Sequence, residues 1–322
     1  MLLRLCGCLR RRRCRVQSYC TGLNWHVAQW DCTLLANRCV TRHCQTWTNL
    51  SMLGEEIVGG SVRAEILRRL RAAEIEHDVR ILYACESGSR AWGFASPDSD
   101  YDVRFIYVRK PNWYLSFDIE RRRDVIEYPI ADEIDCGGWD IRKALHLLTR
   151  TNGALMEWLN SPVRYIEAGS FADALRALAP KVMNSVALCY HYSHMARGNA
   201  REYLFAPQVR LKKYFYVLRP LLAIRYIEQG KGVPPVEFAR LLDSVLPESL
   251  RPSVDRLLDL KRNTGELGMG DQVPEINQFI EQELERHGSS FSGQGRPDVW
   301  DKEAVLGQLN DVFRAAVLSK TT

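Results

Sequence analysis

The sequence predicts an α/β domain followed by a helical domain, and two changes along the chain indicate this division. Before about residue 165, short apolar runs end in polar residues and glycine, as buried strands do. After that point, apolar residues recur at helical spacing over longer stretches. A glycine- and serine-rich segment then precedes one short helix. We therefore expect an α/β domain at 52–165, an all-α domain at 166–288, and a linker with a terminal helix at 289–322.

The α/β domain is expected to hold a leading helix, three strands and a closing helix. Apolar residues at helical spacing predict the helices, and short apolar runs predict the strands. Asp140 is placed as the N-cap of the closing helix. In chain order we expect helix 62–76, strand 79–87, loop 91–99, strand 100–108, strand 125–136, turn 137–139 and helix 140–150. The helices expected after these are 170–198, 199–228, 234–243, 248–263, 273–287 and 302–318.

Residues 1–51 differ in composition from the rest of the chain. They contain eight arginines, no lysine, a single acidic residue and seven of the ten cysteines. They carry a net charge of +7, so the remaining residues carry −2 of the formal +5. We expect these residues to be a basic, cysteine-rich extension outside the fold, with Met52 as a candidate start. The absence of C-x-x-C pairs disfavours a zinc knuckle. No apolar run approaches the roughly 18 residues of a membrane span. The segment from Met52 reads as a normal beginning for a cytosolic domain, so we expect a reduced, cytoplasmic protein.

Two aspartates stand at the start of the second expected strand. Residues two apart on a strand point to the same side, so Asp100 and Asp102 converge. Two carboxylates held close together are unfavourable unless a cation neutralises them or one is protonated. Mg²⁺ suits such a pair because it also binds substrate phosphates. Gly88 lets the backbone approach a phosphate, and Ser89 offers donors to it. A turn leading into a strand uses the same residue types, so the rest of the chain has to decide.

The same residues carry a resemblance to a known superfamily. Gly88-Ser89, a gap of ten residues and then Asp100-Tyr101-Asp102 resemble the signature of the DNA polymerase β-like nucleotidyltransferases. The surrounding segments are similar to the RNA-repair-associated, RlaP-like branch over about residues 60–285. These segments are ACESGSRAWGFASPDSDYDVRFIY, DCGGWDIRKAL, EWLNSP and LKKYFYVLRPLLA. The resemblance implies a mixed-sheet core, a divalent metal (Mg²⁺ or Mn²⁺), and transfer of a nucleoside monophosphate from an NTP with release of pyrophosphate.

The resemblance also implies a third carboxylate. Asp135 lies between Ile134 and Cys136, the pattern that the superfamily uses on its last catalytic strand. Asp140 is the reserve, since an N-cap role explains it better. By the resemblance, Asp100, Asp102 and Asp135 hold metal, and the third acid orients or deprotonates the acceptor hydroxyl.

Several basic and aromatic residues are candidates for binding the nucleotide. Arg90 and Arg104 flank the expected site, although a structural salt bridge explains Arg104 about as well. Lys212, Tyr216 and Arg219 share one helical face, which is either a phosphate and base contact or a solvated basic face. Glu86 is expected to be a structural partner for an arginine. His191 and His194 are expected to be core or cleft-lining residues, because no acid stands near them at zinc-ligand spacing.

The acceptor is left open by the residues alone. An RNA end is the acceptor that we favour, with a protein hydroxyl or a small molecule as alternatives, the latter two as in an antitoxin-like enzyme. A catalytically silent nucleotide- or RNA-binding module is the rival from another class. The intact Gly-Ser and Asp-x-Asp residues argue against that rival, whereas the −2 charge of the body argues against a large nonspecific RNA surface.

Overall fold

The computed structural model describes residues 57–204, 206–263, 268–290 and 301–319. All of these belong to one compact unit, Thr48–Thr322. The extension expected at 1–51 and the candidate start Met52 lie outside the described residues, as does most of the expected linker.

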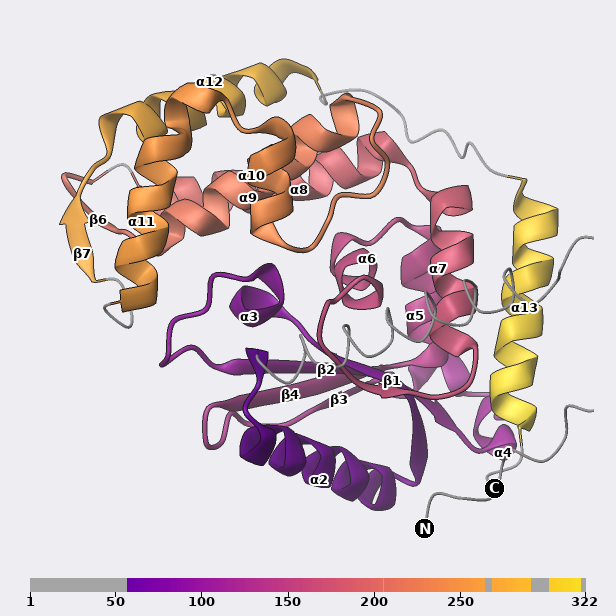
Figure 1. Cartoon of the computed structure of the whole chain (residues 1–322). Coiled ribbons are helices and arrows are strands. Elements are labelled where there is room, and N and C mark those ends of the chain that lie inside the picture. The colour runs from indigo at the N-terminus through magenta and orange to yellow at the C-terminus, as the bar shows by residue number, and fades with distance from the viewer. Residues whose placement is uncertain (1–56, 205, 264–267, 291–300, 320–322) are drawn as a thin grey trace, which may run out of the picture. The chain divides into compact units, whose positions relative to one another are not determined.

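A five-stranded sheet forms the centre of the α/β part (Figure 1). Its strand order is β3-β4-β2-β1-β5, in which β2 and β4 run parallel and the other neighbours run antiparallel. The predicted mixed sheet is therefore confirmed. The strands are β1 (Val79–Glu86), β2 (Tyr101–Arg109), β3 (Val125–Glu127), β4 (Ile134–Asp140) and β5 (Arg164–Glu167).

Helices cover both faces of this sheet (Figure 1). Val103, Phe105 and Tyr107 of β2 pack toward α2 (Gly60–His77), while Ile106 and Val108 pack toward the other face. This alternation is the one that the sequence predicts for residues 100–108. The helices on the second face are α5 (Ile141–Thr149), α6 (Gly153–Leu159), α7 (Phe171–Val182) and α13 (Lys302–Leu318). Short elements complete this part: α3 (Gly88–Trp92), α4 (Pro111–Tyr114) and the 3₁₀ turn η1 (Ile119–Arg121).

The prediction for the third strand was wrong in two respects. The expected strand 125–136 is two strands, because the chain reverses at Asp132 and Glu133, which both adopt positive φ. The expected turn at 137–139 is instead part of β4. A Cβ on Gly138 would lie 2.3 Å from the Phe105 ring, so glycine here makes room for a neighbouring aromatic side chain. Glycine pairs more often mark turns, which is why sequence reasoning failed.

The C-terminal domain is built mainly from helices around its own apolar core. Two expected helices, 170–198 and 199–228, have other boundaries, since Asn184 caps a new helix and a strand precedes Lys213. That strand pairs with a second one, so the domain is not all-α. The elements are α8 (Ser185–Tyr203), β6 (Gln208–Arg210), α9 (Lys213–Glu228), α10 (Phe238–Val245), η2 (Glu248–Leu250), α11 (Arg251–Asn263), β7 (Met269–Asp271) and α12 (Pro274–Ser290).

Two helices expected apart from the α/β domain pack onto it. Leu175 and Leu178 of α7 and Val305 and Leu309 of α13 are buried in the same apolar core as strand β1. The α/β part therefore extends past residue 165 and is completed by the terminal helix.

Candidate active site

Strands β2 and β4 bring two acidic side chains together. Asp102 and Asp135 are register partners on these parallel strands, whose spacing is about 4.8 Å, so their side chains lie next to each other on the same face of the sheet. The guanidinium of Arg104 lies beside both: its Nη2 atom is 2.6 Å from Asp135 Oδ2 and 3.3 Å from Asp102 Oδ1. All three side chains are partly exposed to solvent. Two carboxylates thus share one cation.

The loop after β1 closes tightly over Asp102. Gly88 has φ of +59°, a conformation that favours glycine, and a Cβ there would lie 1.9 Å from Asp102 Oδ2. The backbone N–H of Ser87 donates to the Asp102 carbonyl at 2.8 Å. Gly88 and Ser89 form the start of α3, a helix that was not expected here, and Ser89 is buried. The predicted glycine loop therefore lies directly against the predicted carboxylate.

A buried acidic residue, Glu86, holds the backbone of Asp102 in place. Glu86 is fully buried, its Oε1 accepts a hydrogen bond from the Asp102 backbone N–H at 2.8 Å, and Tyr165 donates its hydroxyl to Oε2. Burial raises the pKa of Glu86 to about 7. The expected arginine partner is thus replaced by a backbone amide and a tyrosine.

The charge around Asp102 is unbalanced in favour of negative groups. Burial raises the pKa of Asp102, and the nearby Asp135 and Asp100 raise it further, although Arg104 acts in the opposite direction. A carboxylate whose charged form is disfavoured in this way is stabilised by an additional cation. Asp100 precedes β2 and is exposed.

These residues fit a divalent metal through two carboxylates. Mg²⁺ is commonly held by one or two carboxylates together with substrate phosphates, and Asp102 and Asp135 supply such a pair. Among the residues that the structure describes, no group of three or more His, Cys, Asp or Glu side chains could hold a metal ion. The predicted set of Asp100 with Asp102 and Asp135 stays a prediction, although both Asp100 and Asp135 lie near enough to Asp102 to raise the pKa of its carboxyl.

Asp140, the reserve for the third acid, lies away from this pair. It stands opposite Tyr107 in the register, five residues along β4 from Asp135, which corresponds to about 16 Å. Its side chain caps α5 by accepting from the Arg142 N–H at 2.8 Å, and it also accepts from the Tyr114 hydroxyl at 2.8 Å. The N-cap role is confirmed, and the reserve role as a catalytic acid was wrong because of this distance.

Arg90 holds the loop between α3 and β2. Its Nη2 atom donates to the Ser99 carbonyl at 2.6 Å, and its guanidinium lies 3.8 Å from the centre of the Tyr101 ring. The side chain is almost completely buried. The predicted phosphate contact at Arg90 is therefore replaced by a role in shaping the loop that precedes Asp100.

The predicted face of Lys212, Tyr216 and Arg219 does not form an open basic surface. Arg219 is 1% exposed and donates to Glu157 Oε1 at 2.8 Å. Tyr216 packs edge-on against Trp92, with ring centres 5.4 Å apart. Lys212 is half-buried at the N-cap of α9. A phosphate contact by Arg219 was thus a wrong prediction, because its charge is already paired in the interior.

Glu157 gathers three donors at the junction of the two domains. Besides Arg219, it accepts from Trp92 Nε1 at 3.0 Å and from the Tyr192 hydroxyl at 3.1 Å. Trp92 ends α3, the helix that Gly88 and Ser89 begin. This cluster therefore ties the glycine loop to the helical domain, and sequence reasoning missed Glu157.

The family model described as the RNA repair pathway DNA polymerase beta family, RlaP, matches residues 62–314. The chain belongs to this family. The resemblance seen in the sequence is thereby confirmed, and the family is of nucleotidyltransferase type. RlaP membership covers both the α/β part and the helical part of the chain.

A relative and a solved structure were also found. The uncharacterized protein YcgL of Bacillus subtilis (strain 168) is 47% identical over 226 residues, which are 70% of this chain and 86% of that protein. The crystal structure of a nucleotidyltransferase-like protein from Exiguobacterium sibiricum 255-15 covers 78% of this chain and 77% of its own, with 12% identity and a TM-score of 0.27. That TM-score is too low to indicate a common fold.

A helix that crosses a bilayer needs about 20 predominantly apolar residues. None of the helices in the described residues is both long enough and apolar enough to cross a membrane.

Proposed function

We propose that this protein is a metal-dependent nucleotidyltransferase that transfers a nucleoside monophosphate from an NTP to a hydroxyl at an RNA end. The observation that carries the proposal is the meeting of Asp102 and Asp135 beside the backbone of Gly88, where Arg104 forms an ion pair with both carboxylates. Membership of the RlaP family supports the nucleotidyl chemistry.

Asp102 and Asp135 would hold Mg²⁺ or Mn²⁺ in this reaction. When bound, the metal stabilises the charge that develops on the transferring phosphoryl group. The acceptor oxygen forms a bond to the α-phosphorus, the bond to the pyrophosphate oxygen breaks, and the acceptor proton passes to a carboxylate. Asp135 is our candidate for that carboxylate. Glu86 fixes the backbone of Asp102, and Gly88 admits the phosphates to the same space.

A labelled-nucleotide assay tests this proposal. Each NTP, labelled at the α-phosphate, is incubated with Mg²⁺ or Mn²⁺ and with RNA, protein and small hydroxyl acceptors. We expect label transfer to RNA together with pyrophosphate release, and loss of both in Asp102→Asn, in Asp135→Asn and with a chelator. Asp259→Asn is the matched control, because Asp259 is an exposed residue of α11 in a surface ion pair.

The outcome also separates the alternatives. Transfer to protein or small acceptors alone would replace RNA as the acceptor in this proposal. Absence of both transfer and pyrophosphate release with every NTP would overturn it in favour of a silent nucleotide- or RNA-binding module.

A further inference from the structure

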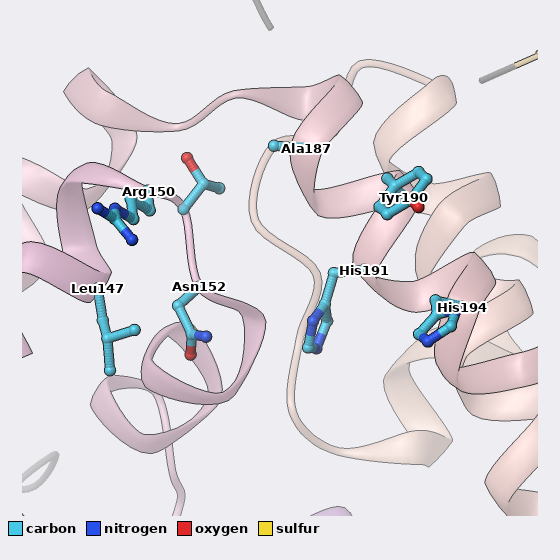
Figure 2. A pocket seen from close by; sticks show the side chains of 8 residues that line it. Leu147, Arg150, Asn152, Ala187, Tyr190, His191 and His194 are labelled. Atoms are coloured by element: carbon cyan, nitrogen blue, oxygen red, sulfur yellow. The ribbon is translucent and has the colours of Figure 1, made fainter. Parts of the chain in front are cut away.

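A cavity lies between the α5–α6 connection and helix α8. Its volume is about 290 Å³, near the lower limit of about 300 Å³ for small-ligand pockets. Figure 2 shows Leu147, Arg150 and Asn152 on one side, and Tyr190, His191 and His194 of α8 on the other. Thr151 and Ala187 complete the lining. The expectation that His191 and His194 line a cleft is therefore confirmed.

The α8 side of this cavity presents flat rings. The rings of Tyr190 and His194 are parallel to within 3°, with centres 6.5 Å apart, so a flat ligand that stacks on one ring is parallel to the other as well. The Tyr190 side chain is 52% exposed, although a large aromatic residue more commonly packs into the interior. Aromatic faces of this kind are the usual platforms for unstacked bases.

The facing side of the cavity offers a cation and an amide. Arg150 is exposed and forms no ion pair within the described part of the chain. The Asn152 carboxamide oxygen caps α6 by accepting from the Leu155 N–H at 3.0 Å, which directs donation to its NH₂ group. A guanidinium suits a phosphate, and an amide NH₂ suits the acceptor atoms on the edge of a base.

The cavity wall also carries backbone strain and an unsatisfied polar atom. Thr151 is a β-branched residue at φ of +53°, and its hydroxyl fixes it there by donating to the Val182 carbonyl at 3.1 Å. His191 Nε2 is buried and has no hydrogen-bond partner among the described residues. Strained backbone and unsatisfied groups concentrate at functional sites.

We propose that this cavity binds one nucleotide unit, with its base stacked on Tyr190 and His194 and its phosphate on Arg150. The source that we favour is a nucleotide of the acceptor RNA strand, and in that respect the inference rests on the proposed function. A free mononucleotide has the same chemistry and is the other source. The cavity lining offers a metal two imidazoles, His191 and His194, and no carboxylate, which is fewer than the three or four protein ligands of a zinc site.

The test measures binding of the full chain to a fluorescent single-stranded RNA of eight nucleotides by anisotropy. We expect Tyr190→Leu to weaken binding between about fivefold and 150-fold, the range for loss of one stacked base. Tyr190→Phe keeps the flat ring and should bind like the unmodified protein. Arg150→Ala should lower the slope of log affinity against log salt by about one, whereas Arg71→Ala, which removes an exposed arginine of α2, should leave it unchanged.

Competition distinguishes the two sources. Displacement of the RNA by the four nucleoside monophosphates at micromolar concentration would assign the cavity to a free nucleotide, and resistance to them would assign it to the strand. Equal binding by Tyr190→Leu, Arg150→Ala and the unmodified protein would overturn the proposal, as would a lack of binding to every probe.

Failure of this inference and failure of the proposed function give different results. Asp102→Asn should lose transfer and keep Tyr190-dependent binding. If no transfer occurs with any NTP while Tyr190→Leu still weakens RNA binding, the catalytic proposal fails and the cavity proposal stands. If transfer proceeds and the affinity for RNA is unchanged in Tyr190→Leu and Arg150→Ala, only the cavity proposal fails.

Discussion

An arginine pairs with acidic side chains in two regions of the molecule: at the starts of strands β2 and β4, and at the junction of the two domains. The first region has more acidic side chains than arginines in contact, whereas the charges balance in the second. At the strand starts, two partly exposed aspartates share Arg104. At the junction, Arg219 pairs one to one with Glu157, both side chains are buried, and Trp92 and Tyr192 donate to the same carboxylate. Surplus negative charge next to solvent suits a site that binds a cation and phosphates. A neutral, fully bonded cluster suits a structural role.

This contrast predicts that removing a carboxylate lowers activity in the first region and lowers folding stability in the second. Asp102→Asn should reduce transfer by about 10³-fold, because several kcal/mol of transition-state stabilisation are lost. The same change should leave the melting temperature equal or higher, since the raised pKa of Asp102 means that its charge is disfavoured in the folded state. Label transfer and thermal unfolding measure the two effects. A clear fall in melting temperature would show that Asp102 is structural, like Glu157.

At the junction, Glu157→Gln should chiefly destabilise the fold. Breaking a buried ion pair leaves Arg219 uncompensated, which costs about 3–5 kcal/mol of unfolding free energy. The double variant Glu157→Gln with Arg219→Met removes both charges, so its loss should be smaller than the sum of the single losses. Denaturant unfolding measures each value. Additive losses would mean that the two side chains act independently.

The difference between the regions also explains what sequence reasoning could reach. Gly88 and Asp102 lie within one short segment, so the contact of the glycine loop with this carboxylate is a local one. Asp135 was chosen through the resemblance to the superfamily, and the register of β2 with β4 places it beside Asp102.

The junction lay beyond such reasoning. Glu157 and Arg219 are 62 residues apart in the sequence, and no local pattern around either residue predicts that the two form an ion pair. The helical spacing of Lys212, Tyr216 and Arg219 is correct, but whether that face meets solvent or another domain depends on tertiary packing. Tyr190 and Arg150 were missed for the same reason, since the two walls of their cavity come from helix α8 and from the α5–α6 connection.

The glycine loop offers a smaller and more specific test. Gly88→Ala combines unfavourable φ with a Cβ 1.9 Å from Asp102 Oδ2, so the carboxylate must move. We expect a loss of about 1–2 kcal/mol of stability from the backbone conformation and a loss of transfer of at least about tenfold. Gly93→Ala is the matched control, because its φ is +83° and nothing lies within 4 Å of the added Cβ. Equal activity of the two variants would remove Gly88 from the site.

Substitution of Asp140 should have the smallest effect on transfer of the changes considered. Asp140 resembles Asp135 in residue type and strand, yet it caps α5 and accepts from Tyr114. Asp140→Ala should cost about 0.5–2 kcal/mol of stability, the usual range for loss of an N-cap. Transfer per folded molecule should stay within about twofold, because the residue is about 16 Å along the strand from Asp135. A large loss of transfer with unchanged stability would mean that distance along β4 does not separate the structural from the reactive acid.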